Sequence, residues 1–268
     1  MDLGISGRAA VVTGAGAGIG FAVAEELMAN GASVVIADRD ASRLQKSETE
    51  LRKRPGAKVA SIAVDVAAPE AAARIVDAAL AAFGAIDILI NNAGRAHAGG
   101  LMSASDEDWD DMTAVKLTAM RRLCKAAIPN MRHRRWGRIV NMSSIGGIYP
   151  NPKLFVSHVL SAAINNFTKS LALEVAGDGV LVNAIAIGAV ATDNWANNMV
   201  PALRRTRPEF SSLSDEDVIA RISAELTPVG RAGKPAEIAA IAAFLSSERN
   251  GFVTGATIEA SGRADRFM

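Results

Sequence analysis

A glycine-rich segment near the N-terminus has the spacing of a phosphate-binding turn. It reads Thr13-Gly14-Ala15-Gly16-Ala17-Gly18-Ile19-Gly20, directly after an apolar run, and a helical pattern begins at once. Glycines let backbone N–H groups approach a pyrophosphate, which then lies at the positive end of the helix. Glycines also form tight turns that bind nothing, but in this context the segment predicts a dinucleotide site. Its expected contacts are Gly14, Gly16, Gly18, Ile19 and Gly20.

An acidic residue ends the next apolar run, where the ribose of such a ligand would lie. Asp38 follows the glycine turn by about twenty residues, and a carboxylate there can accept hydrogen bonds from both ribose hydroxyls and would repel a 2′-phosphate. Ala17 offers no basic group to an extra phosphate, whereas Arg39 beside Asp38 could do so. We therefore expect NAD rather than NADP, with Asp38 and Arg39 at the ribose.

The single tyrosine of the chain invites a catalytic interpretation. Tyr149 and Lys153 form a Tyr-x-x-x-Lys string, but residues four apart share a face only on a helix. Pro150 and Pro152 exclude a regular helix across this segment. We therefore interpret the tyrosine–lysine string as a chance occurrence and not as a catalytic pair. Tyr149 alone could still border a substrate pocket, although packing is the simpler role.

Short apolar runs rich in Val, Ile and Ala alternate with longer helical patterns along the chain. The expected strands are Ala9 to Thr13, Ser33 to Ala37, Lys58 to Val64, Ile86 to Asn91, Arg138 to Met142, Leu181 to Ala186 and Ala256 to Glu259. Expected helices include Gly20 to Asn30, Glu70 to Phe83, Trp109 to Met131, Phe155 to Ala176 and Pro235 to Ser246. The runs are apolar without alternation, as in strands covered on both faces. The pattern predicts one α/β domain over residues 1–268, a doubly wound Rossmann fold with a seven-stranded parallel sheet.

The segment 193–227 breaks this rhythm, because apolar residues such as Trp195 mix with arginines. An insertion beyond the carboxyl end of a strand indicates a substrate lid. The apolar side chains suggest an apolar ligand, whereas Arg204, Arg205 and Arg207 could admit a carboxylate or phosphate. A solvated lid face explains the arginines equally well.

The composition of the chain indicates which kinds of partner it can bind. The chain has 268 residues, 50% of them hydrophobic, and a formal net charge of +1, which gives no attraction to nucleic acid or an anionic membrane. No stretch reaches the roughly 18 uninterrupted apolar residues of a membrane span. One cysteine, Cys124, and three scattered histidines supply neither a disulfide framework nor a metal-ligand cluster. We expect a cytoplasmic protein that binds a small molecule and no metal.

Further motifs follow in order along the whole chain. They are Asp65-Val66, Asn91-Asn92-Ala93-Gly94, Arg138 to Ser144, Asn183 to Thr192, Pro228 to Arg231 and Thr254-Gly255. Together with the glycine turn, they resemble the short-chain dehydrogenase/reductase family. The resemblance implies that Asp65 and Val66 hold an adenine and that Asn91, Ala93 and Gly94 line the cofactor. It also implies that Val190 and Thr192, after Gly188, bind the nicotinamide amide, although the family's usual proline before Gly188 is Ile187 here.

The resemblance further implies a catalytic set of serine, tyrosine, lysine and asparagine, in which the lysine lowers the pKa of the tyrosine. Ser144 matches the serine, but the tyrosine position is Ser157 and the lysine position is Ser161. The surrounding helix matches the family without a gap. The asparagine position is Lys116, which could return the missing positive charge from the opposite helix, or could extend to solvent and contribute only packing.

Two histidines lie near this set. His97, in the loop after Gly94, could line the pocket, although a surface role is simpler. His158 follows Ser157 but lies about 100° around the helix and is expected to face away.

Two main functions fit these residues. The first is an NAD-dependent oxidoreductase acting on an unidentified alcohol or ketone, with the proton moved by water, Lys116, Tyr149 or His97. The second is a catalytically weak or inactive NAD-binding sensor or scaffold, and a lyase or isomerase with structural NAD is a third. The retained segment Gly188 to Thr192 favours the oxidoreductase. The resemblance also implies a homotetramer or homodimer, packed through helices 109–131 and 155–176.

Overall fold

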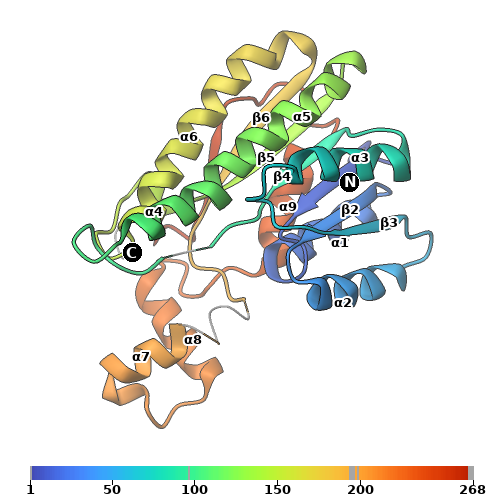
Figure 1. Cartoon of the computed structure of the whole chain (residues 1–268). Helices are drawn as coiled ribbons and strands as arrows, with labels where there is room; N and C mark the ends of the chain where they lie inside the picture. The colour runs from blue at the N-terminus through green and yellow to red at the C-terminus, as the bar shows by residue number, and fades with distance from the viewer. Residues whose placement is uncertain (1, 96, 193–196, 198, 265–268) are drawn as a thin grey trace.

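The computed structural model describes residues 2–95, 97–192, 197 and 199–264, and its centre is a parallel sheet. Seven strands lie in the order β3-β2-β1-β4-β5-β6-β7 (Figure 1). They are β1 (Ala9–Thr13), β2 (Ser33–Asp38), β3 (Val59–Ala63), β4 (Ile88–Asn91), β5 (Gly137–Ser144), β6 (Val180–Ile187) and β7 (Thr257–Ala260). Every pairing is parallel. The predicted doubly wound sheet is confirmed, and each expected strand is found within two residues of its predicted ends.

Helices cover both faces of this sheet. One face carries α3 (Ala71–Phe83), α5 (Ala119–His133) and α6 (Phe155–Val175), and the other carries α1 (Gly18–Ala29), α2 (Ala41–Arg52) and α9 (Pro235–Leu245). Strand side chains alternate between the two cores: Val11 packs in the first and its neighbour Val12 in the second. This burial on both faces explains why the strands are apolar without alternation. Within the described residues, no helix combines the length and apolar character that crossing a bilayer requires.

The helix expected over 109–131 is more complex than its sequence pattern. It starts earlier, as α4 (Asp106–Thr113), because Ser105 and Asp108 form a capping box at its N-terminus. The segment η1 (Ala114–Thr118) then widens into a π-helical turn before α5 continues. Single π turns inside α-helices occur frequently at functional sites, and this one contains Lys116.

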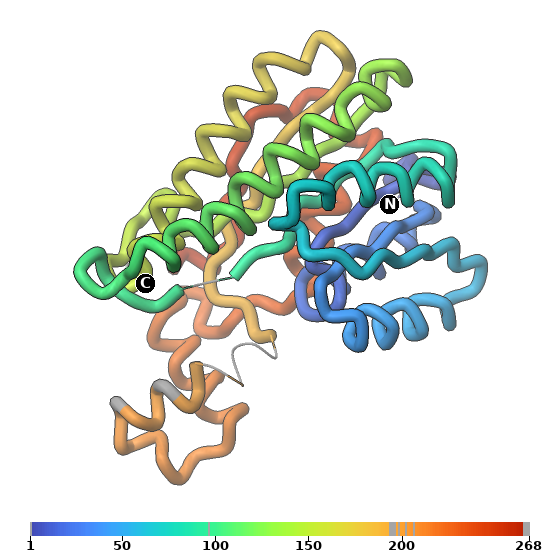
Figure 2. The backbone as a smooth tube through the Cα atoms, viewed as in Figure 1, coloured from blue at the N-terminus to red at the C-terminus, as the bar shows by residue number. Residues whose placement is uncertain are grey.

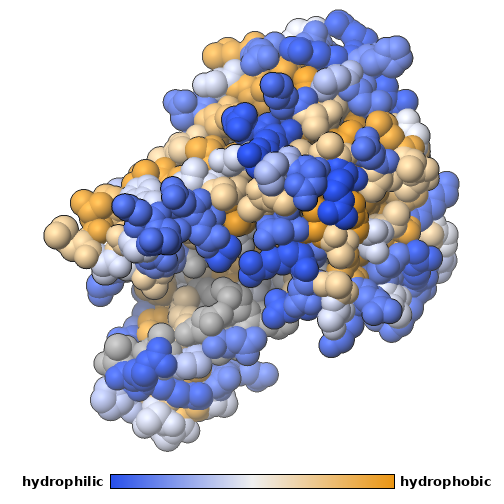
Figure 3. Space-filling view, viewed as in Figure 1, coloured by the Kyte–Doolittle hydropathy of each residue, from blue (hydrophilic) through white to orange (hydrophobic). Residues whose placement is uncertain are grey.

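The segment expected as a lid projects from the layered body. It contains α7 (Val200–Thr206), a short turn η5 (Pro208–Phe210) and α8 (Asp215–Leu226), and it stands apart in the backbone tube (Figure 2). Figure 3 shows it as a separate lobe with a largely hydrophilic surface. The expected lid residues 193–196, Trp195 among them, lie outside the described residues.

Two lid arginines are engaged inside this lobe. Arg204 pairs with Asp215 at 2.7 Å, and Arg207 pairs with Glu225 at 2.7 Å and lies over the buried ring of Phe210. These contacts hold α7 against α8. They favour the structural interpretation of Arg204 and Arg207 over the binding of an anionic substrate.

The strand order reverses beside β1. The chain moves outward from β1 to β2 and β3, and then returns to β4 on the other side of β1. Ligands of open α/β sheets bind at the carboxyl ends of the strands at such a reversal. The turn after β1 contains the glycine-rich segment, and Asn91 to Gly94 lie at the end of β4 and in the loop after it, so the fold brings these two motifs together.

Candidate functional site

The glycine turn after β1 has the backbone geometry that its sequence predicts. Gly18 has a φ of +58°, in the left-handed region, and begins helix α1 without any side-chain cap. The first N–H groups of α1 are therefore free to bind an anion. Gly20 lies so close to the preceding turn that a Cβ on it would be 2.2 Å from the carbonyl oxygen of Gly14.

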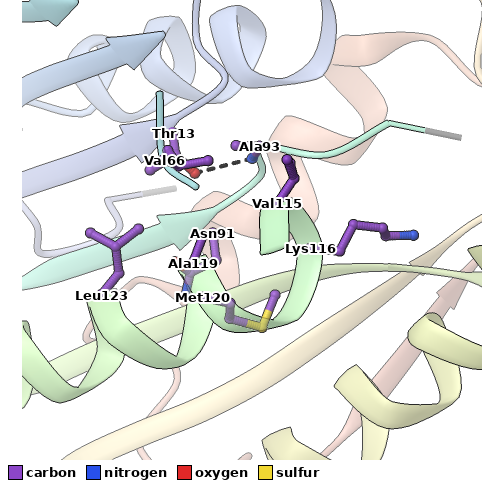
Figure 4. Close-up of a pocket in the computed structure, with 9 residues that line it drawn as sticks. All are labelled: Thr13, Val66, Asn91, Ala93, Val115, Lys116, Ala119, Met120 and Leu123. Carbon is purple, nitrogen blue, oxygen red and sulfur yellow. Dashed lines mark hydrogen bonds between the residues drawn. The ribbon is translucent and has the colours of Figure 1, made fainter. Parts of the chain in front are cut away.

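Thr13 and Asn92 tie the glycine turn to the loop after β4. The Asn92 side-chain amide donates to the carbonyl oxygens of Thr13 (2.9 Å) and Gly14 (3.1 Å). The backbone N–H groups of Asn92 and Ala93 both donate to the Thr13 hydroxyl oxygen at 3.0 Å, and Figure 4 shows the bond from Ala93. Thr13 was not among the predicted contacts, and Asn92 was predicted only as part of the cofactor-lining segment Asn91 to Gly94. Its place directly after β4, where the strand order reverses, was the signal for this connection.

Asp38 lies at the end of β2 beside this turn. One of its carboxylate oxygens accepts from the Gly16 N–H at 3.0 Å, and the other accepts from the Asp40 N–H at 3.0 Å. Each carboxylate oxygen has a second lone pair, so Asp38 can still accept bonds from ribose hydroxyls. Arg39 beside it is exposed.

One cleft collects most of the predicted cofactor residues. Its lining consists of Gly14, Asp38, Arg39, Val64, Asp65, Val66, Ala93, Gly94, Arg95 and Val115. Asp38 lies directly beside the glycine turn and accepts from its Gly16 N–H, and helix α1 starts at Gly18 in the same turn. This arrangement of donors and acceptors fits the adenosine and pyrophosphate of a dinucleotide. A small adjoining pocket includes Asn91 and Lys116 (Figure 4).

Asn91 combines one satisfied and one unsatisfied polar atom. Its Nδ2 donates to Asn141 Oδ1 at 2.8 Å, and Asn141 Nδ2 donates to the Thr168 hydroxyl at 3.0 Å. The buried Oδ1 of Asn91 has no hydrogen-bond partner among the residues that the structure describes. An unpaired buried acceptor beside the cleft suits a site that a polar ligand completes.

The residues expected at the nicotinamide end follow β6. The Gly188 N–H donates to the carbonyl oxygen of Ala260, and the buried Val190 forms a bridge with Gly233. The Thr192 methyl carbon is 3.6 Å from where a Cβ on Gly18 would lie. The loop after β6 therefore lies beside the start of α1, next to the predicted pyrophosphate site.

Ser144 lies at the end of β5, held against α6. Its Oγ accepts from the Gly146 N–H at 3.2 Å, which leaves the hydroxyl proton available to donate. Ser143 beside it donates to the carbonyl oxygen of Ser161 at 3.1 Å. A Cβ on Gly147 would be 2.6 Å from the carbonyl carbon of Ser161, so the turn η2 (Ile145–Gly147) packs directly on α6.

Lys116 reaches across from η1 to both replacement serines. Its Nζ lies 3.3 Å from Ser157 Oγ and 3.3 Å from Ser161 Oγ, and both serines are buried on α6. The carbon stem lies along the cofactor loop, since Lys116 Cγ is 3.7 Å from where a Cβ on Gly94 would stand. The structure thus brings together three of the five predicted catalytic residues in one hydrogen-bonded cluster.

Burial lowers the pKa of Lys116 to about 8. Its side chain is partly buried between η1 and α6, and removal from water disfavours the charged form. Across the described ranges, no carboxylate forms an ion pair with it. About one tenth of the amine is therefore expected to be neutral at pH 7, and about half at pH 8.

The Tyr149 and Lys153 string is not helical. Both residues precede α6, which begins at Phe155, and Tyr149 is held through its backbone N–H on the Ile145 carbonyl oxygen. Lys153 is exposed, whereas Tyr149 is half-buried beside the turn that follows Ser144. The prediction that prolines exclude a helix here is confirmed.

The two neighbouring histidines are engaged elsewhere. His97 Nε2 lies 3.3 Å from Asp108 Oδ2 at the start of α4. His158 is buried against Gly146, and its Nδ1 accepts from the Asn151 N–H at 2.8 Å. Burial, together with the charge of Lys116, lowers the pKa of His158. Both rings thus support loops that border the site.

Comparison with known proteins gives a consistent picture. The family model described as short chain dehydrogenase matches residues 8–200. The 3-oxoacyl-[acyl-carrier-protein] reductase FabG of Vibrio cholerae is 36% identical over 97% of this chain and 98% of its own length. Galactitol 2-dehydrogenase (L-tagatose-forming) of Cereibacter sphaeroides is 35% identical over 96% of this chain and 95% of its own. The structure of L-sorbose reductase from Gluconobacter frateurii, complexed with NADPH and L-sorbose, superposes with a TM-score of 0.93 at 33% identity and covers 100% of both chains.

Proposed function

This chain belongs to the short chain dehydrogenase family, and from that premise we propose that it is an NAD-dependent oxidoreductase with altered acid/base machinery. The proposed reaction interconverts an alcohol and a ketone. The family membership supports oxidoreductase activity. An altered mechanism is proposed because Ser157 and Ser161 stand in place of the family's tyrosine and lysine.

The observation that carries the proposal is the cleft between the glycine turn and Asp38. When bound there, a nicotinamide dinucleotide supplies a hydride acceptor or donor. Asp38 would hold the ribose hydroxyls, and the free N–H groups at the start of α1 would hold the pyrophosphate. Gly188, Val190 and Thr192 would border the nicotinamide, and Ser144 would donate to the substrate oxygen.

The proposed cofactor differs from that of two structural relatives. The L-sorbose reductase structure contains NADPH, and a second similar protein, YwfH, is described as an NADPH-dependent reductase (TM-score 0.87, 28% identity, 97% of this chain and 99% of its own). In this chain the carboxylate of Asp38 would repel a 2′-phosphate, although Arg39 and Arg95 also line the cleft. We therefore retain NAD as the proposed cofactor.

The substrate proposal is limited to its chemical class. Galactitol 2-dehydrogenase and L-sorbose reductase are named for polyols or ketoses, and FabG for a 3-oxoacyl group. All of these are secondary alcohols or their ketones. We propose a compound of that class, enclosed from one side by the α7–α8 lobe acting as a lid.

The direct test follows hydride transfer by the absorbance of NADH at 340 nm. The protein is expected to form NADH from NAD with members of a panel of polyols and 3-hydroxyacyl thioesters, or to consume NADH with the matching ketones. If neither direction proceeds with any member while NADH still binds, the weak or inactive NAD-binding protein becomes the better description.

The variant that tests the role of Asp38 is Asp38→Asn, which keeps the shape of the side chain and removes its charge. Hydrogen bonds to charged groups contribute about 1.5–3 kcal/mol, so the Kd for NADH is expected to rise about 10- to 150-fold while that for NADPH falls or stays unchanged. Fluorescence titration with both cofactors measures this. Equal weakening for both would show that Asp38 only stabilises the Gly16 turn.

We also propose that the chain assembles as a homotetramer or homodimer through α5 and α6. Leu173 on α6 is 87% exposed, and Val159 on the same helix is 45% exposed. Sedimentation velocity decides between assembly and a monomer. The expected cytoplasmic location stays a prediction from composition.

A further inference from the structure

We propose that the Lys116 amine exchanges the substrate proton in this site, with Ser157 and Ser161 as its positioning residues. The inference rests on the proposed oxidoreductase function and deepens it. In the family, residues at positions on α6 carry out this proton exchange. Here the exchange is assigned to a side chain on the π turn η1, on the opposite side of the site.

The two hydroxyls can serve both protonation states of the amine. Ser161 donates its only hydroxyl proton to the carbonyl oxygen of Ser157 at 2.8 Å, so toward Lys116 Nζ its oxygen can only accept. Ser157 Oγ can accept as well, so the two N–H groups of the neutral amine can donate to the two serine oxygens and leave the nitrogen lone pair for the substrate proton. The nitrogen is therefore held in place before and after it loses a proton.

The charges around Lys116 leave its proton exchangeable. From α6 it faces Ser157, Ser161 and the titratable His158, from the β4 loop it faces Gly94, and from α5 the apolar Met120 lines the same pocket. Of the carboxylates on α4, Asp108 binds Ser105 and His97, and Asp111 binds Arg95. Within the part of the chain that the structure describes, no anion fixes the ammonium form, and exchange near neutral pH becomes possible.

Other candidate groups are less suitable. His97 is paired with Asp108, and His158 uses Nδ1 to accept from Asn151. Lys116 is the cation that lies at once against the cofactor loop and against the positions where the family places its proton-transfer residues.

The proton and electron balance is simple. In alcohol oxidation, a bound oxidised nicotinamide would supply the hydride acceptor for the carbon–hydrogen bond that breaks, and neutral Lys116 Nζ would take the hydroxyl proton as the C=O bond forms. In ketone reduction, a bound reduced nicotinamide would supply the hydride to the carbonyl carbon, and the Lys116 ammonium would give one proton to the oxygen. Oxidation needs the neutral amine and is expected to speed up as pH rises through about 8. Reduction needs the ammonium and is expected to slow over the same range.

The kinetic test compares Lys116→Met with Lys116→Arg. Loss of a positioned acid/base group costs about 10²–10⁴ in rate, so both variants are expected to lose that much kcat with little change in KM or in the Kd for NADH. Arginine stays charged at all working pH values and so would rescue a purely electrostatic role. Lys169→Met, on the exposed side of α6, is the matched control and is expected to stay within twofold of the wild type. A kcat of Lys116→Arg within tenfold of the wild type would overturn the inference.

A titration without turnover completes the test. In protein labelled with ¹³C-lysine, the Lys116 Cε resonance is assigned by its loss in Lys116→Met and is expected to titrate near pH 8. Ser161→Ala removes one acceptor of the N–H groups and is expected to lower this midpoint further. If the wild type transfers no hydride, the proposed function fails and the titration judges the inference: an ordinary midpoint above pH 10 overturns it, and one near 8 that moves in Ser161→Ala supports it.

Discussion

Gly20→Ala is expected to lower the free energy of unfolding by about 3 kcal/mol or more and to abolish tight NADH binding. The new Cβ would lie 2.2 Å from the Gly14 carbonyl oxygen and 2.5 Å from Asn92 Nδ2. The first of these atoms belongs to the backbone, so the turn itself has to move, and overpacking of this kind costs about 1–3 kcal/mol or more. Because Gly14 lines the cofactor cleft, the same movement spoils the binding site.

Thermal unfolding and NADH fluorescence titration measure both effects. At about 2–4 °C for each kcal/mol in a chain of this size, the apparent Tm is expected to fall by about 6–12 °C. Gly177→Ala is the control, because a Cβ there would meet nothing within 4 Å. An unchanged Tm and NADH affinity in Gly20→Ala would contradict the packing of α1 against the turn.

Asp87→Ala is expected to destabilise the chain by about 3–5 kcal/mol at the opposite end of the sheet. The Asp87 side chain is 1% exposed, accepts from the Ala9 N–H at 2.9 Å and lies 2.9 Å from Arg134 Nε. Arg8, the second cation beside it, stacks on Trp136 at 3.9 Å from the ring centroid. Removal of the carboxylate leaves a buried N–H unpaired and takes the counterion from Arg134, whereas Arg8 keeps its pair with Glu248 at 2.9 Å. Breaking a buried pair costs about this much.

Urea unfolding of Asp87→Ala against Glu50→Ala checks this prediction. Glu50 pairs with Lys53 on the surface of α2, where both side chains are more than half exposed, and exposed pairs contribute about 0–1 kcal/mol. NADH affinity is expected to be retained in both variants, since Asp87 directly precedes β4 and the cofactor cleft lies at the other end of the strand. A loss below 1 kcal/mol for Asp87→Ala would show that water replaces the carboxylate.

Hydrophobic patterning predicted the sheet well, and for a physical reason. Strands buried on both faces give uninterrupted apolar runs, so β1 was located to the residue and the others within two. The polar helix α2 was not among the predicted elements, because only Leu44, Ser47 and Leu51 of it are buried and its apolar pattern is correspondingly faint. The π turn was missed because one extra residue within a helix leaves no mark on composition.

The sequence predicted only part of the candidate site. Spacing identified Asp38 and the two substituted serines, because backbone geometry fixes where those positions lie. It left open whether Lys116 turns inward or toward solvent, since a four-carbon side chain can do either. Hydrogen bonding to two buried hydroxyls, on a turn whose shape the pattern did not reveal, decides this question in favour of the inward orientation.

The 3.3 Å contact between Lys116 Nζ and Ser161 Oγ also constrains how this site can change. A lysine at 161 would bring a second ammonium into the same dry space, where like charges repel strongly. The two ways of supplying an amine, from η1 or from α6, therefore exclude each other. Placing the lysine at position 161 would therefore require a change at Lys116 as well as at Ser161.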